Sequence, residues 1–151
     1  MNKTNDKKVC SFFVSDYHFE MITLPYIEKE IENNKKIIIL TDKDLTPTIN
    51  VLLERMNLSN EKKSKIRKID WNINDSEKIN QIKNENNEDE IIFIKGRKDY
   101  VINMRKNVDY CAGNKQIECI DCYDLNELGD EASDIAKNYG EVLNTLGKAI
   151  I

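Results

Sequence analysis

Five short apolar runs, most of them rich in isoleucine and separated by longer polar stretches, constrain the fold of this chain more than any other feature. The runs cover residues 9–14, 37–40, 66–71, 91–94 and 117–123. Ile37–Leu40 and Ile91–Ile94 are apolar at every position, so neither alternates between a core face and a solvent face. Strands buried on both faces are typical of a parallel sheet covered by helices. The pattern therefore predicts an α/β fold: a three-layer α/β/α sandwich with a mainly parallel sheet of five or six strands.

The stretches between these runs carry apolar residues at helical spacing. Pro25 lies inside the first stretch, where its missing backbone N–H predicts a kink or two short helices. Thr46-Pro47 predicts the start of the next helix, with Thr46 as its N-cap, and Gly140 predicts the end of the last one. Residues 84–90 are typical of a surface loop, and residues 142–151 fit either an edge strand or a packed extension. We expect the helices near residues 16–31, 46–56, 59–65, 75–83, 99–112 and 128–139.

The length of 151 residues suits one domain, which would bury roughly 70% of the surface that the unfolded chain exposes. We expect a single α/β domain over residues 1–151, with residues 1–7 flexible. The net charge is −4 and the two signs are interspersed, which argues against a general nucleic-acid binder. No apolar run approaches the roughly 18 residues needed to cross a bilayer, and the first residues are polar rather than signal-like. We therefore expect a cytoplasmic protein that contacts neither nucleic acid nor a membrane.

In an open α/β sheet, ligands bind beyond the carboxyl ends of the strands. Neither glycine-rich phosphate motif occurs in the chain, and the turn Ser15–His18 contains no glycine that would let backbone approach a pyrophosphate. Asp16 in that turn would also repel a phosphate. The sequence therefore argues against an ATPase or a dinucleotide enzyme, and we expect no cofactor. The strand ends instead predict a ligand-binding crevice lined by His18, Asp42, Lys95, Arg97, Tyr123 and Asp124.

Some of these residues also have a plainer interpretation. His18 is the one histidine of the chain; it could act as an acid/base or pH-sensing group, but a structural histidine at the start of a helix is favoured. The basic loop Lys95–Lys98 could bind an anion together with free helix N–H groups, although a solvated turn is the favoured interpretation. No Ser/His/Asp or Cys/His arrangement is evident around the single histidine.

The four cysteines are expected to be reduced and free of metal in a cytoplasmic protein. Cys119 and Cys122 form a C-x-x-C pair within the last apolar run. Residues three apart on a strand point to opposite faces, which prevents both chelation and disulfide closure. Buried strand cysteines that act as small apolar residues are therefore favoured over a zinc or redox role.

The order of these features resembles the MEDS sensory domain, named for a regulator of methanogens and methylotrophs. The similarity lies in Val9–Phe13, an acidic turn, a helix through Leu24–Ile27, a second strand at Lys35–Leu40, a helix at Leu52-Leu53, and Ile120–Asp124. It covers nearly the whole chain through loose, mostly hydrophobic motifs. The resemblance implies a RecA-like or Rossmann-like α/β domain without the phosphate-binding loop.

This chain departs from that family in two places. Many relatives have a glycine before the second strand, where this chain has Asn33-Asn34. Relatives also often carry a His-Pro pair near the C-terminus, where this chain reads Leu143–Gly147. Any contact that this histidine makes in the family is not carried over.

The resemblance implies a non-enzymatic sensory or regulatory domain. Such a domain would bind a small-molecule ligand or a regulatory protein partner, such as a histidine kinase, an anti-sigma factor or a transcription regulator, and would act in trans. Two alternatives stay open: a small metabolite-binding enzyme that holds a phosphorylated or carboxylated substrate with Lys95 and Arg97, and a structural adaptor protein of a mobile element.

Overall fold

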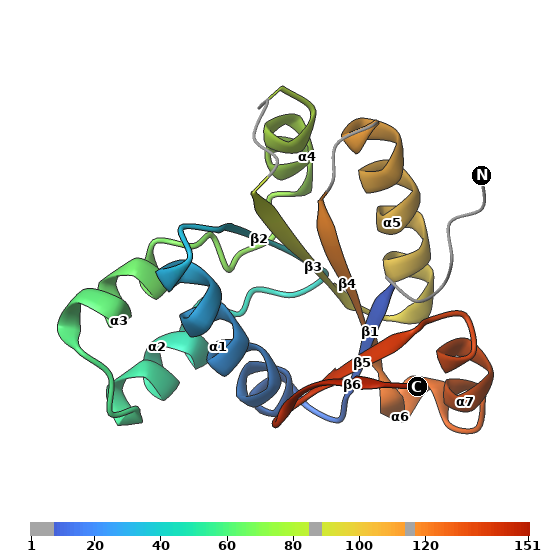
Figure 1. The fold of residues 1–151 in the computed structure, drawn as a ribbon, viewed down its shortest axis with the longest axis horizontal. Coiled ribbons are helices and arrows are strands. Elements are labelled where there is room, and N and C mark those ends of the chain that lie inside the picture. The colour runs from blue at the N-terminus through green and yellow to red at the C-terminus, as the bar shows by residue number, and fades with distance from the viewer. Residues whose placement is uncertain (1–7, 85–88, 114–116) are drawn as a thin grey trace.

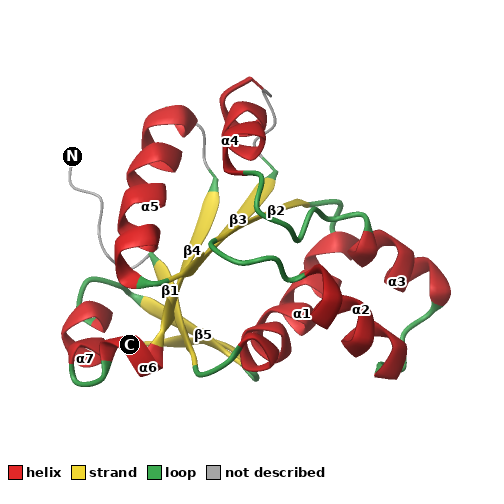
Figure 2. Cartoon of the chain, turned by 180° about the vertical axis from the view of Figure 1, so that it is seen from behind, coloured by secondary structure: helices red, strands yellow, loops and turns green. Residues whose placement is uncertain are grey.

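A six-stranded sheet runs through the molecule, with helices packed on both of its faces (Figures 1 and 2). The computed structural model describes residues 8–84, 89–113 and 117–151. The sheet order is β2-β3-β4-β1-β5-β6, and every neighbouring pair is parallel except the terminal hairpin β5–β6. The expected three-layer, mainly parallel α/β fold is confirmed. The strands are β1 (Val9–Phe13), β2 (Lys36–Thr41), β3 (Glu90–Gly96), β4 (Glu118–Asp124), β5 (Glu141–Asn144) and β6 (Gly147–Ile150).

The helices divide between the two faces according to the side chains they bury. On the first face, helices α1 (Asp16–Glu32), α2 (Thr46–Arg55) and α3 (Asn60–Arg67) pack on the core cluster that contains Phe19, Leu53 and Phe93. The second face is covered by α4 (Asp75–Asn84), α5 (Lys98–Ala112), α6 (Leu125–Leu128) and α7 (Glu131–Ala136). β2 and β3 are apolar on both sides and contribute side chains to both cores, as the sequence pattern predicts; β4 also contributes to both.

The prediction of a strand at residues 66–71 was wrong. Ile66 lies in the last turn of α3, and the chain then continues as a loop that passes along the first face. Ile66 and Ile69 are three residues apart, which is also helical spacing, and both contact the core. Trp71 is buried there with its indole N–H donating to the carbonyl of Ile66 at 2.9 Å. Apolar burial alone therefore does not distinguish this segment from a strand.

Three helix details also differ from expectation. α1 is one continuous helix through Pro25, so the alternative of two short helices was wrong. Leu45, rather than Thr46, is the N-cap of α2, and Asp44 Oδ1 accepts the Thr46 N–H at 2.9 Å. The expected helix at 128–139 is two short helices, because Gly129 ends α6 with a φ of 53°.

The C-terminal segment forms an edge hairpin rather than a packed extension. The expected flexible residues 1–7, and most of the loop expected at 84–90, lie outside the described residues. Within the described part of the chain, no helix is both long and apolar enough to cross a membrane.

Candidate functional site

The carboxyl ends of β1 and β4 form the switch point of the sheet. From β1 the chain crosses over the first face through α1 to β2, whereas from β4 it crosses the second face through α6 and α7 to β5. The two strands are neighbours, with Phe13 opposite Asp124. Connections that leave in opposite directions open a crevice where α/β proteins bind ligands. The side chains at this edge are therefore the first candidates for a site.

Asp16 holds two lysines at this edge. It lies in the first turn of α1, directly after β1, and its Oδ1 is 2.9 Å from Lys95 Nζ at the end of β3. Its Oδ2 is 2.8 Å from Nζ of Lys43, which follows β2. Burial raises the pKa of Asp16, but hydrogen bonds from Lys43 and Lys95 outweigh that effect and hold the pKa below its usual value. The start of α1, a place that attracts anions, is thus occupied by a carboxylate of the chain itself.

Lys95 is buried although it is charged, with only 2% of its surface exposed. Its Nζ lies 4.7 Å from the ring centroid of Phe13 and 5.5 Å from that of Phe19. Two aromatic faces and one carboxylate therefore replace the water around this ammonium group. Lys43 is the accessible partner, because 66% of its side chain is exposed.

Glu20 lies one helical turn beyond Asp16 and is fully buried. The Thr48 hydroxyl of α2 donates to Glu20 Oε2, and among the described residues Oε1 has no hydrogen-bond partner. Burial is the main cause that raises the pKa of Glu20 to about 7, and the negative charge of Asp16 adds to it. A carboxyl group with a pKa near neutral therefore lies one helical turn from the Asp16 ion pairs.

The start of α5 is also occupied by carboxylates of the chain. Asp42 Oδ2 accepts the Arg97 N–H at 3.2 Å, and Glu127 Oε1 of α6 accepts the Lys98 N–H at 2.8 Å. The Arg97 guanidinium also forms an ion pair with Glu127, with Nη2 3.3 Å from Oε2. Gly96 makes this approach possible, because a Cβ on it would lie 2.7 Å from Asp42 Oδ2.

The structure brings three of the six predicted site residues together and gives the others local roles. Asp42, Lys95 and Arg97 lie side by side, since the Asp42 N–H also donates to the Lys95 carbonyl at 3.2 Å. His18 Nδ1 accepts the Val14 N–H at 2.9 Å, which is the structural role that was favoured.

Asp124 and Tyr123 are the remaining predicted residues. Asp124 caps α6 by accepting the Asn126 N–H at 2.9 Å. Tyr123 points to the second face, where its hydroxyl lies 2.7 Å from that of Tyr139. The predicted aromatic wall of the crevice is therefore not formed by Tyr123.

Sequence reasoning did not include several residues that the structure adds to this edge. Asp16 and Glu20 are four residues apart on one helix face, which is the one local signal that could have found them. The contacts with their partners depend on the fold, because those partners lie in other segments: Lys43, Thr48 and Lys95.

A second buried polar cluster lies on the other face, around Asp121 of β4. Its Oδ2 accepts the Tyr139 hydroxyl at 2.5 Å and lies 2.9 Å from Arg105 Nη1 of α5. The Asp121 side chain is 3% exposed, and burial raises its pKa. The cluster connects β4 to α5 and to the segment after α7, so it has a structural role.

The cysteines lie as predicted with respect to the sheet faces. Cys119 packs in the core of the second face and Cys122 in that of the first. All four are free thiols, and burial raises the pKa of Cys10 to about 12 and those of Cys119 and Cys122 well above the usual value. Among the described residues, no group of three or more His, Cys, Asp or Glu side chains could hold a metal ion.

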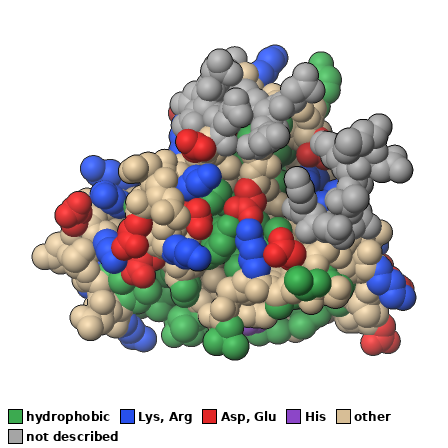
Figure 3. All heavy atoms as spheres, viewed as in Figure 1, with side chains coloured by type: hydrophobic (Ala, Val, Ile, Leu, Met, Phe, Trp, Pro, Cys, Tyr) green, Lys and Arg blue, Asp and Glu red, His purple; other side chains and the backbone are tan. Residues whose placement is uncertain are grey.

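Charge on the surface is mixed. Figure 3 shows lysine and arginine side chains interspersed with aspartates and glutamates on the side of the molecule seen in Figure 1. Ion pairs between helices contribute to this pattern; Lys62 of α3, for example, is 2.8 Å from Glu32 and 3.9 Å from Glu28 of α1.

The fold has a counterpart among solved structures. A protein from Pyrococcus horikoshii OT3 superposes with a TM-score of 0.54 at 12% sequence identity, over 99% of this chain and 87% of that one. At this identity the likeness concerns the fold alone. No family model matches the chain, and no curated protein matches it in sequence.

Proposed function

We propose that this chain is a non-enzymatic sensory or regulatory domain that binds a small anionic ligand where β1, β2 and β3 end. The observation that carries the proposal is the Asp16 carboxylate, which is shared by Lys43 and Lys95 at the start of α1. A carboxylate or phosphate group of a ligand offers the same oxygens to the same two ammonium groups. In the ligand-free domain Asp16 takes the place of that group.

This arrangement suits a sensor because binding is an exchange. A ligand would displace Asp16 from the exposed Lys43, while the buried Lys95 keeps its place between two aromatic rings. Lys43 belongs to the segment between β2 and α2, so the exchange would move this segment relative to α1. Such a change can alter contacts with a regulatory protein partner, as the resemblance to the MEDS domain implies.

An enzyme that acts on a small metabolite is the second candidate. Glu20 favours it, because a carboxyl with a pKa of about 7 suits general acid–base catalysis. The side chain is fully buried, however, behind Asp16 and Thr48, and so has no path to a substrate in this conformation. The sensory function is therefore the better supported of the two.

The test is calorimetric titration of the purified domain with inorganic phosphate and with citrate. Asp16→Asn removes the internal competitor and should strengthen anion binding at least about ten-fold, since hydrogen bonds to charged groups contribute about 1.5–3 kcal/mol. Lys43→Gln should weaken binding. Lys106→Gln, which removes an exposed lysine of α5, is the matched control and should bind as the unaltered domain does.

The proposal fails if neither anion binds to Asp16→Asn, or if this variant and the unaltered domain bind them equally. Equal loss of affinity in Lys43→Gln and Lys106→Gln would also contradict it, because a general charge effect would then explain the binding.

A further inference from the structure

The outer edge of β2 carries backbone groups that no other strand of the sheet pairs with. β2 is the first strand in the sheet order and pairs with β3 alone. The Lys36 N–H donates to the Asp89 carbonyl on the β3 side at 2.9 Å. Since successive residues of a strand point their backbone groups in opposite directions, those of Ile37 and Ile39 point away from the sheet.

Among the described residues, the N–H and carbonyl of Ile37 have no hydrogen-bond partner, and Ile37 keeps 8% of its surface exposed, whereas Ile39 is fully buried. The carbonyl of Ile39 accepts a hydrogen bond from the Lys78 ammonium at 2.6 Å. The outer edge of β2 is thus open at Ile37, and the buried Lys78 closes it at Ile39. This donor and acceptor pattern is what an added β-strand requires.

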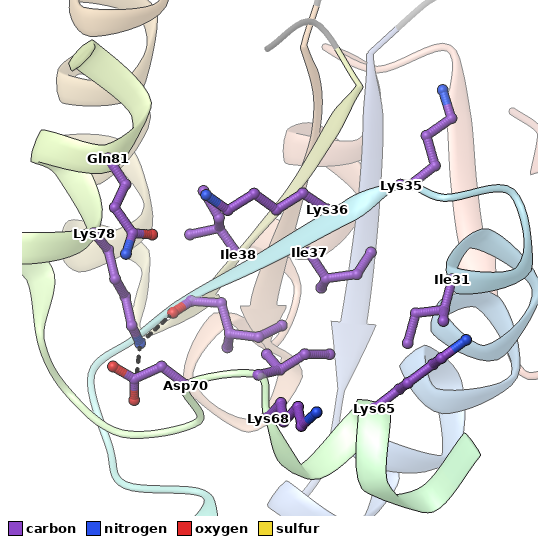
Figure 4. A pocket seen from close by; sticks show the side chains of 12 residues that line it. Ile31, Lys35, Lys36, Ile37, Ile38, Lys65, Lys68, Asp70, Lys78 and Gln81 are labelled. Atoms are coloured by element: carbon purple, nitrogen blue, oxygen red, sulfur yellow. Dashed lines mark hydrogen bonds and ion pairs between the residues drawn. The ribbon is translucent and has the colours of Figure 1, made fainter. Parts of the chain in front are cut away.

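A groove of about 370 Å³ runs along this edge between α1, α3 and α4. Its apolar lining includes Ile31, Ile37 and Ile69, next to the open backbone groups. Its charged lining is one-sided, in a chain whose net charge is −4. Figure 4 shows how these side chains surround β2; they are one aspartate, Asp70, and five lysines, Lys35, Lys36, Lys65, Lys68 and Lys78.

Two of these lysines have carboxylate neighbours that a ligand could replace. Lys65 Nζ lies 3.5 Å from Glu61, and Lys35 Nζ lies 3.7 Å from Asp89. Both carboxylates are largely exposed, so these ion pairs are weak and exchangeable. The groove therefore presents basic side chains that are available to a partner.

We propose that the β2 edge binds an extended, acidic peptide segment of a partner protein, which adds to the sheet as a further strand. Backbone hydrogen bonds to Ile37 would fix its position, and alternate acidic side chains would reach the lysines on either side. A nucleic acid would use the lysines but not the backbone ladder. This surface is separate from the anion site at Asp16, so the inference stands whether or not that site binds a ligand.

The same charges exclude a second copy of the chain. Pairing two β2 edges would bring the lysines of both copies together, and lysine at an exposed edge is a known protection against self-association. The lysines that repel a second copy of the chain attract an acidic strand. The lysines therefore select the partner as well as protect the edge.

The test measures the fluorescence anisotropy of a labelled heptapeptide of alternating glutamate and valine, with a lysine–valine heptapeptide as the charge control. Ile37→Pro removes the outward N–H without touching the bonds to β3, since proline is tolerated where the N–H faces away from the sheet. Ile37→Ala is its matched control, because it loses the same side chain but keeps the N–H. Circular dichroism establishes that both variants are folded.

We expect the acidic peptide to bind and the basic peptide not to bind. Ile37→Pro should bind it at least about five-fold more weakly than Ile37→Ala, as one lost hydrogen bond implies. The double variant Lys65→Gln/Lys68→Gln should lose about three- to ten-fold, against no loss in Lys106→Gln.

Four outcomes would overturn the proposal. The acidic peptide does not bind, or Ile37→Pro binds it as tightly as Ile37→Ala, in which case attraction is electrostatic only. A single-stranded oligonucleotide that competes with the peptide and binds Ile37→Pro unchanged would point to a nucleic-acid surface. A dimer in sedimentation analysis that Ile37→Pro abolishes would make a second copy the occupant.

Discussion

Replacing Glu20 by glutamine should remove a pH dependence from the stability of the domain. Glu20 is fully buried, and burial raises its pKa from the usual 4.5 to about 7. Below pH 4.5 the folded and unfolded states both hold the proton, so the advantage of the folded state is fully present. As the pH rises toward 7 the unfolded state loses its proton first, and the free energy of unfolding falls. Each pH unit is worth about 1.4 kcal/mol, so the total fall is about 3 kcal/mol.

The hydrogen bonds around Glu20 support this sign. The Thr48 hydroxyl is within donor distance of both Glu20 Oε2 and the Leu45 carbonyl, but it has one hydrogen. A protonated Glu20 can donate to Thr48, which then donates to Leu45, and all three groups are paired. The glutamine side-chain amide can donate in the same way, so Glu20→Gln imitates the protonated carboxyl at every pH.

Urea denaturation between pH 4.5 and 8.5 checks the prediction. The free energy of unfolding of Glu20→Gln, minus that of the unaltered protein, should rise by about 3 kcal/mol across pH 4.5–7 and then stay constant. Glu54→Gln, at an exposed position of α2, should run parallel to the unaltered protein. A constant difference between Glu20→Gln and the unaltered protein at all pH values would refute the reasoning.

Three further predictions concern packing and accessibility. Gly96→Ala should lower the free energy of unfolding by about 1–3 kcal/mol, because the new methyl group would crowd Asp42; thermal or urea unfolding measures this. Arg105→Met should cost about 3–5 kcal/mol in urea by leaving Asp121 buried without its cation, and adding Asp121→Asn should recover part of the loss; a loss below about 1 kcal/mol would contradict this. With a thiol reagent under native conditions, Cys111 should react first, since it is half-buried; fast reaction of four thiols would contradict the burial of Cys10, Cys119 and Cys122.

The central strands and most helices could be predicted because their signals are local. Ile37–Leu40 and Ile91–Ile94 lie in β2 and β3, buried on both faces as their composition implies. The failure at residues 66–71 has a physical cause: burial next to β2 requires apolar residues, and a helix end followed by a loop supplies them as well as a strand does. The sequence contains no local feature that separates the two.

The candidate site was less predictable because its geometry depends on strand register. Lys95 lies opposite Cys122 across β3 and β4, and both point to the first face. Tyr123 is one position further along β4 and so points to the second face. The ends of the strands could be located from the sequence, but a difference of one residue in register decides which side chains share a crevice. The ion pair of Asp16 with Lys95 joins residues 79 positions apart, which no local pattern reveals.

In the proposed function, the starts of α1 and α5 at the carboxyl edge of the sheet would make anion binding reversible. α1 starts at Asp16, which holds Lys43 and Lys95, and the first N–H groups of α5 are bound by Asp42 and Glu127. An incoming anion gains only the difference between its own contacts and those of the carboxylate it displaces. The proposed site would therefore bind an anion weakly and release it fast, so that its occupancy follows the concentration of the anion. Asp16 lies one helical turn before Glu20, whose pKa is about 7. Displacing the Asp16 carboxylate from the lysines would change the electrostatic field at the Glu20 carboxyl. Ligand binding and proton binding are therefore expected to be coupled at this edge, each altering the affinity for the other.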